Sequence, residues 1–169
     1  MKIRTWQIIV TLICQILGVL FHFTYEWSGE NKFVAVFSAT NESTFEHLKL
    51  TFFPMLLMAI IGYFVIGKRS KNYWFAEVIG ILFAIFFIIV FFYTYTGVIG
   101  RNFAPIDIAT FFVAVILGEY ITYRLLITTK FYDMELGAIV LLGLLLFGFV
   151  LYTYIPPQIA LFEDPTNNY

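Results

Sequence analysis

Charged residues are scarce in this chain of 169 residues, where Asp, Glu, Lys and Arg together make up 12% of the sequence. A soluble domain carries about 25%, so a water-facing surface is excluded for most of the chain. The net charge of −1 provides no basic surface, which excludes nucleic acid as a partner. Cys14 is the only cysteine, and an intrachain disulfide is therefore impossible. No phosphate-binding loop, dinucleotide fingerprint, G-x-S-x-G elbow or C-x-x-C pair suggests a reaction.

Hydrophobic residues, in contrast, make up 61% of the chain, and the mean hydropathy is +0.88. A helix needs about 20 apolar residues to cross a bilayer, and hydrocarbon offers the backbone no hydrogen-bond partner outside a helix. The sequence therefore predicts an all-α, polytopic membrane bundle, one domain over residues 1–169 with the lipid bilayer as its surroundings. The five predicted helices cover residues 5–26, 48–66, 75–97, 106–127 and 136–155.

Lys and Arg are distributed unevenly among the connecting segments. Seven of them fall on the side of the N-terminus and three on the other side. Because cytoplasmic loops carry the excess of Lys and Arg, we predict a multi-pass protein of the cell membrane with a cytoplasmic N-terminus and an external C-terminus. The loop 27–47 and the tail FEDPTNNY (162–169) would then both lie outside.

Three short sequence matches recur at a fixed offset of 59 residues: 51–53 with 110–112, 71–73 with 130–132, and 93–95 with 152–154. They favour a parallel duplication of a two-helix unit, an arrangement found in transporters. The alternative is that Tyr and Thr gather independently at the aromatic belts of the membrane interfaces.

Polar side chains form a stripe along the first predicted helix. The spacings of three and four residues place them on one helical face, which we expect to point into the bundle because unpaired polar groups are costly in lipid. A helix–helix contact is the simpler explanation for Gln15 and Gly18. The stripe consists of Thr11, Gln15, Gly18, His22 and Glu26.

The start of the second helix carries the most specific local signal. Ser43 and Glu46 have the S-x-x-E spacing of a capping box, which would give Glu46 a structural role without a ligand. That role leaves Asn41, Glu42 and His47 as candidate ligand-binding residues. An Asn-Glu-Ser sequence at a helix N-terminus also presents free backbone amides to an anion.

Four residues could together form a metal site. They are both histidines of the chain and two nearby carboxylates: His22, Glu26, Glu46 and His47. This set would suit a divalent transition metal as a cofactor. The H-E-x-x-H spacing is absent, and a protonatable network of His and Glu is the alternative. We expect the His22 and His47 rings to lie within about 10 Å of each other, on the scale of metal-site geometry.

Glu119 lies deep within the fourth predicted helix, where an acidic residue usually faces a partner or a pathway. A local contact with Arg124 or Tyr123 is the alternative. Asp107, near the other end of the same helix, would complete the outer ligand site. Glu77, near the start of the third helix, is expected at the membrane interface.

At HFTYEWSGEN (22–31) and NESTFEHLK (41–49), the chain resembles an uncharacterised family of small bacterial integral membrane proteins. That family carries Tyr-Glu-Trp-Ser-Gly and Asn-Glu-Ser-x-x-Glu-His-Leu-Lys motifs. The resemblance implies a bacterial membrane setting and carries no activity.

These observations favour a small transport or ligand-binding membrane protein whose His/Glu site faces outward and takes a small polar or ionic ligand. With only five helices, a homodimer would help to form a full pathway. The alternatives are a metal-dependent hydrolase acting at the outer leaflet, in which a metal-bound water attacks the substrate, and a structural subunit of a membrane complex. The sequence does not decide whether the protein is an enzyme.

Overall fold

The computed structural model describes residues 1–128 and 130–164 and has the predicted all-α fold. Each of its five long helices is long and apolar enough to cross a membrane, so the protein is a multi-pass integral membrane protein surrounded by lipid. The helices are α1 (Ile3–Trp27), α2 (Thr44–Val65), α3 (Tyr73–Ile99), α4 (Ala104–Leu126) and α5 (Glu135–Tyr154). Short 3-10 turns are η1 (Val34–Val36), η2 (Gly67–Arg69), η3 (Tyr132–Met134) and η4 (Ala160–Phe162).

Local capping explains where the helix ends differ from the predicted ones. Helix α2 begins at Thr44, before the predicted residue 48, because the Ser43 hydroxyl accepts a hydrogen bond from the Glu46 amide at 3.4 Å. Helix α3 continues past Gly97 to Ile99, where Gly100 adopts a left-handed φ of 85° and ends it. Of the predicted external tail, residues 165–169 lie outside the described part of the chain.

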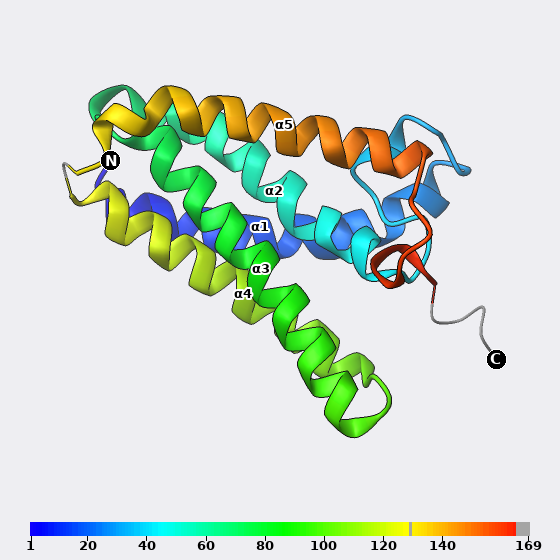
Figure 1. The fold of residues 1–169 in the computed structure, drawn as a ribbon. Coiled ribbons are helices and arrows are strands. Elements are labelled where there is room, and N and C mark those ends of the chain that lie inside the picture. The colour runs from blue at the N-terminus through cyan, green and yellow to red at the C-terminus, as the bar shows by residue number, and fades with distance from the viewer. Residues whose placement is uncertain (129, 165–169) are drawn as a thin grey trace.

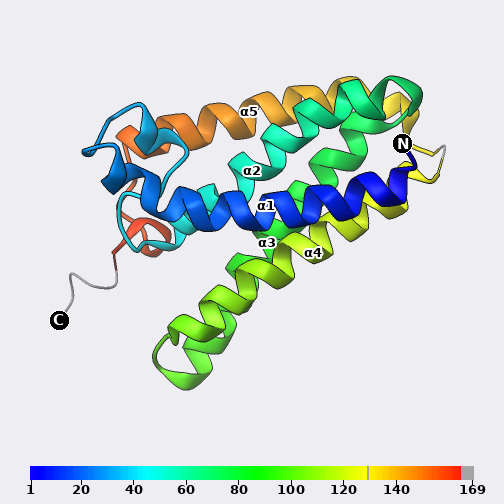
Figure 2. The same cartoon turned by 180° about the vertical axis from the view of Figure 1, so that it is seen from behind.

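The helices are arranged around α3, which packs against α2, α4 and α5, while α1 packs against α2 and α4. Figure 1 shows α1, α2 and α5 running along one another, with the loop after α1 gathered at the end where α5 also ends. The hairpin of α3 and α4 diverges from them, and its turn projects away from the bundle in both views (Figures 1 and 2). A wedge-shaped opening, lined by residues of all four of these helices, lies between this hairpin and the α1–α2 pair.

The packing does not reflect the predicted duplication of a two-helix unit. Helix α2 packs against α3, but α4 packs chiefly against α3 and α1, and α5 packs against α3. The two predicted hairpins are therefore not equivalent in their contacts. The duplication therefore stays a prediction from the sequence, with the aromatic belts as its alternative.

Two glycines allow α3 and α4 to approach closely where they cross. A Cβ atom on Gly80 would lie 2.7 Å from the Gly118 carbonyl oxygen, and one on Gly118 would lie 2.7 Å from the Gly80 carbonyl oxygen. The Thr122 hydroxyl donates across the crossing to the Ala76 carbonyl at 3.3 Å. Small residues of this kind are the usual means of bringing membrane helices together.

We predict that Gly118→Ala lowers the thermal stability of the protein in detergent, because the added methyl group forces α3 and α4 apart. Overpacking of this kind typically costs about 1–3 kcal/mol. The matched control is Gly148→Ala on α5, where an added Cβ meets nothing within 4 Å. Equal melting temperatures for the two variants would show that the crossing tolerates a wider separation.

Candidate functional site

The wedge between the α3–α4 hairpin and the α1–α2 pair contains a cavity of about 780 Å³, here called the histidine cavity. Its wall is largely apolar, with Ile88 and Phe92 contributed by α3. A small set of polar side chains interrupts this wall. The set consists of His22, Glu42, Thr44, His47, Asn102, Asp107 and Thr110.

Three of these side chains meet at one point of the wall. The Nε2 atom of His47 lies 3.5 Å from Glu42 Oε2, and the Nε2 atom of His22 lies 4.0 Å from Glu42 Oε1. The two imidazole rings are 5.4 Å apart between centroids and stand edge to face. This separation agrees with the expected convergence of the two histidines. One potential ligand atom from each of the three residues lies within 4.8 Å of the others.

A backbone carbonyl orients His47. Its Nδ1 atom lies 3.0 Å from the Ser43 carbonyl oxygen, one helical turn earlier. Because a carbonyl oxygen only accepts, Nδ1 must carry the proton and donate it. The other ring nitrogen, Nε2, faces Glu42, and in a ring that carries only the Nδ1 proton it can serve as a ligand atom.

The N-terminus of α2 places Glu42. The Asn41 side-chain oxygen accepts a hydrogen bond from the Ser43 amide at 2.9 Å, forming a tight turn around Glu42. Since Ser43 is the N-cap, Glu42 and His47 occupy the N′ and N4 positions, which regularly touch at helix starts. From this positional rule, the contact between Glu42 and His47 could have been predicted from the sequence.

The other two predicted metal ligands lie elsewhere. Glu46 is 4% exposed and forms an ion pair with Lys49 at 2.6 Å. Its Oε2 atom also accepts hydrogen bonds from the Thr40 amide at 2.7 Å and the Thr40 hydroxyl at 3.0 Å. Glu26 is exposed near the end of α1, and its carboxylate makes no ion pair with any residue that the structure describes. The predicted set is therefore corrected: the two histidines meet Glu42, and neither Glu26 nor Glu46 joins them.

The segment between α1 and α2 is attached by hydrogen bonds to both helices. The Ser38 hydroxyl hydrogen-bonds the Phe21 carbonyl and accepts from the Tyr25 amide at 2.8 Å. On the other side, Lys49 Nζ donates to the Ala35 carbonyl at 2.7 Å. The predicted long loop thus folds back on α1 and α2, and it delivers Glu42 to the wall of the histidine cavity.

Asp107 lines the same cavity, but it also stabilises the α3–α4 turn. Its carboxylate accepts hydrogen bonds from the Tyr95 hydroxyl and from Asn102 Nδ2, the latter at 3.1 Å. The Tyr95 oxygen in turn accepts from the Phe103 amide at 3.2 Å. Arg101 lies over the Phe103 ring, with its guanidinium carbon 4.6 Å from the ring centroid.

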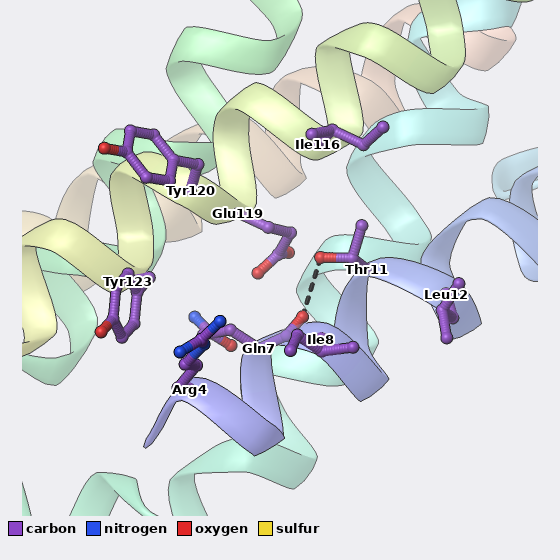
Figure 3. Close-up of a pocket in the computed structure, with 9 residues that line it drawn as sticks. All are labelled: Arg4, Gln7, Ile8, Thr11, Leu12, Ile116, Glu119, Tyr120 and Tyr123. Atoms are coloured by element: carbon purple, nitrogen blue, oxygen red, sulfur yellow. Dashed lines mark hydrogen bonds between the residues drawn. The ribbon is translucent and has the colours of Figure 1, made fainter. Parts of the chain in front are cut away.

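A second cavity of about 510 Å³, the Glu119 cavity, lies nearer the N-terminal end of α1. Figure 3 shows Glu119 pointing from α4 toward Gln7 and Thr11 on α1, with Arg4 and Tyr123 beside them. Glu119 is only 2% exposed and Gln7 only 4%. Glu119 Oε2 and both side-chain polar atoms of Gln7 have no hydrogen-bond partner among the described residues. The structure does not pair Glu119 with Arg124, which instead donates to the Tyr120 hydroxyl at 2.8 Å.

Glu77 on α3 is the polar residue whose position was not expected. It is 3% exposed and buried within the bundle. The start of α3 is itself buried, because Asn72 donates to the Leu125 and Lys130 carbonyls at 2.9 and 3.0 Å. In the sequence, the feature that could have indicated this burial is that Glu77 is the only charged residue in α3.

A short packed segment separates the two cavities along the seam between α1 and α4. On α1 the separation runs from Leu12 to Gly18, which is about 9 Å at the helical rise of about 1.5 Å per residue. Gly18 lies directly against the Phe111 ring. Gln15 Nε2 donates to the Phe112 carbonyl at 3.5 Å.

The fold and these residues define a small multi-pass membrane protein with a His/Glu group at the wall of a polar cavity. A family model described as a family of unknown function (DUF6512) matches residues 1–169, and the chain belongs to that family. No curated protein and no solved structure matches the chain.

We predict that Lys49→Met destabilises the protein more than the double variant Glu46→Gln/Lys49→Met. The single change leaves a buried carboxylate without its cation, which typically costs about 3–5 kcal/mol, whereas the double change removes both charges. Thermal unfolding in detergent measures the difference, and limited proteolysis of residues 28–43 reports whether the segment detaches. Equal stabilities would mean that the pair contributes nothing to anchoring the segment.

Proposed function

We propose that this protein binds a small cation in the histidine cavity and transports it along the α1–α4 seam to the Glu119 cavity. One observation carries the proposal: two cavities, each with polar side chains in a largely apolar wall, lie in line on the same pair of helices, in opposite halves of the bundle. A protein that only scaffolds a complex has no need of such a pair. A transport protein needs a site that faces each side of the membrane.

The composition of the histidine cavity favours a cation. Glu42 and Asp107 contribute negative charge, and the two imidazoles contribute lone pairs. Neither Lys nor Arg is among the residues that line it. A low-dielectric wall strengthens the field of the carboxylates, so a cation is attracted and an anion is repelled.

Pro54 adds a neutral acceptor to the same wall. Because proline has no amide hydrogen, the Leu50 carbonyl one turn earlier loses its helical donor. That carbonyl oxygen would lie 2.7 Å from a Cβ on Gly18, and Leu50 and Gly18 both line the cavity. It offers a partial negative charge at the end of the histidine cavity nearest the Glu119 cavity.

Glu119 forms the inner end of the proposed transport route. A carboxylate in a hydrocarbon-depth site is costly without a partner, and Oε2 of Glu119 has none in the described structure. A proton or a cation would stabilise its negative charge.

The packed segment between the cavities would act as the gate. It consists of side-chain contacts, Gly18 with Phe111 and Gln15 with Phe112. Among the residues that the structure describes, no ion pair joins α1 to α4 there. A shift of the α3–α4 hairpin relative to α1 would open it, since that hairpin already diverges from the bundle (Figure 2). Both cavities lie within one chain, so this route does not require the predicted homodimer.

The metal-dependent hydrolase is less well supported, because it needs a second carboxylate free to activate water. Glu46 is bound by Lys49 and Thr40, and Asp107 is bound by Tyr95 and Asn102.

The proposed orientation keeps the N-terminus in the cytoplasm, so that the histidine cavity opens outward and the Glu119 cavity lies toward the inner face.

We predict that a cysteine introduced at Asn31 reacts with an impermeant thiol reagent only from outside the cell. Asn31 is exposed in the segment after α1, and the native Cys14 is fully buried, so the background reaction is small. The matched control is Asp133→Cys in η3, at the opposite end of the bundle, which should react only after the membrane is permeabilised. The reverse pattern would invert the proposed direction of the two cavities.

We predict that Glu119→Gln slows cation flux into proteoliposomes by more than about tenfold, because it removes the only charge at that depth of α4. Fluxes of Na⁺, K⁺, Mg²⁺ and Co²⁺ are measured with internal indicators under an imposed gradient. Glu26→Gln is the control, since Glu26 lies outside both cavities, and it should retain wild-type flux. If the wild-type protein moved none of these ions, the transport proposal would fail.

A further inference from the structure

We infer that His22, Glu42 and His47 form a binding site for a divalent transition metal ion in the wall of the histidine cavity. The inference rests on the proposed function in one respect, since it names the class of cation that the cavity takes. The site itself depends only on the geometry of these three side chains and can be tested without any flux.

The chemistry of the three side chains selects the metal class. Two imidazoles and one carboxylate are ligands that Zn²⁺ and its neighbours bind well, whereas Mg²⁺ and Ca²⁺ prefer sites made only of oxygen. Na⁺ and K⁺ gain little from imidazole. Among the cations that the cavity attracts, the histidines therefore distinguish the transition metals.

The distances are close to those that a metal requires. Ligand atoms at about 2.0–2.2 Å from a tetrahedral ion lie about 3.3–3.5 Å from one another. The His47–Glu42 separation is already 3.5 Å, and the His22–Glu42 separation is 4.0 Å. All three ligand atoms already lie within 4.8 Å of one another. Rotation of the Glu42 and His22 side chains that moves their tips by less than about 1.5 Å would therefore bring the set together.

The surroundings orient the ligands as a metal site needs. A ligating histidine usually donates its other ring nitrogen to a backbone carbonyl or a carboxylate, and His47 Nδ1 does so to the Ser43 carbonyl at 3.0 Å. The Asn41–Ser43 turn and the anchored segment before it restrict Glu42. These contacts come from the backbone and from residues other than the ligands, so they are present before a metal binds.

Three protein ligands leave a position open. Structural zinc sites are closed by four protein ligands, whereas three leave room for water or a substrate. The His and Glu side chains are 36% and 49% exposed, so an ion can enter from solution. The open position faces the cavity that they line. Exchange of the ion is therefore expected, in keeping with a transport or capture site.

The structure also allows a role without metal, in which Glu42 simply pairs with the two histidines. In that case the three residues stabilise the start of α2, and added metal changes nothing. The two roles differ in their response to a metal ion alone, which makes the experiment direct.

The experiment uses the full-length protein purified in detergent and stripped with chelator. Co²⁺ alone is added, and its d–d absorption is followed, with Zn²⁺ then added as a competitor. We expect one Co²⁺ per chain, a tetrahedral or five-coordinate spectrum, and displacement by Zn²⁺. We also expect Zn²⁺ to raise the melting temperature, because an ion that binds only the folded state stabilises it.

Three variants test the ligands, and one matched variant controls for charge. His22→Gln, His47→Gln and Glu42→Gln should each weaken Co²⁺ binding by more than about tenfold, since loss even of an outer-shell partner commonly costs about 10–100-fold. Glu26→Gln removes the same charge from the same end of the bundle but from outside the trio, and it should bind Co²⁺ like the wild type. Circular dichroism and melting without metal confirm that each variant is folded.

The outcomes separate this inference from the proposed function. Absence of stoichiometric Co²⁺ binding by the folded wild-type protein would overturn the metal site, and so would equal losses in Glu42→Gln and Glu26→Gln. Na⁺ or K⁺ flux that persists in such a protein would leave the transport proposal intact. Tight Co²⁺ binding in a protein that moves no cation would support the site and refute transport.

Discussion

The buried ion pair between Glu46 and Lys49 is the interaction on which the histidine cavity depends. Glu46 binds the Thr40 backbone and hydroxyl, and Lys49 binds the Ala35 carbonyl, so the pair joins the first turns of α2 to the segment that returns from α1. With it, the chain passes directly over the end of α1, and Glu42 is brought between two histidines from different helices.

The fold was predictable from the sequence because hydrocarbon allows so few solutions. A helix is the only way for an isolated apolar segment to satisfy its backbone, so five apolar runs meant five helices, and the Ser43 cap was readable from its spacing. The convergence of His22 and His47 was predictable for the same reason, since antiparallel consecutive helices bring their adjoining ends to one depth. The stripe on α1 pointed to its inner face, and Gln15 and Gly18 do contact α4.

The remaining features depend on contacts between distant residues, which periodicity does not reveal. The sequence offered four candidate carboxylates near the histidines, namely Glu26, Glu42, Glu46 and Asp107. Lys49 removes Glu46 from this group, because it lies on the same helix as Glu46 and pairs with it while it also binds the loop. The close approach of α3 and α4 depends on Gly80 and Gly118, which the sequence does not distinguish from the other glycines of the apolar helices. Glu77 was assigned to the interface because it lies near a helix start, whereas Asn72 buries that start against the α4–α5 connection.

Glu46 and Glu119 show why the α1–α4 seam is a stronger candidate pathway than the apolar core around it. Both carboxyl groups are almost fully buried, 4% and 2% exposed respectively. Glu46 has a cation and two hydrogen-bond donors at a single oxygen, so burial costs it little and it serves the fold. Glu119 faces a cavity with an oxygen that has no partner among the described residues, and the stability of the fold gains nothing from that arrangement. A buried carboxyl group without a partner is stabilised when it takes up a proton or binds a cation, and the proposed pathway along the seam leads from the histidine cavity to Glu119.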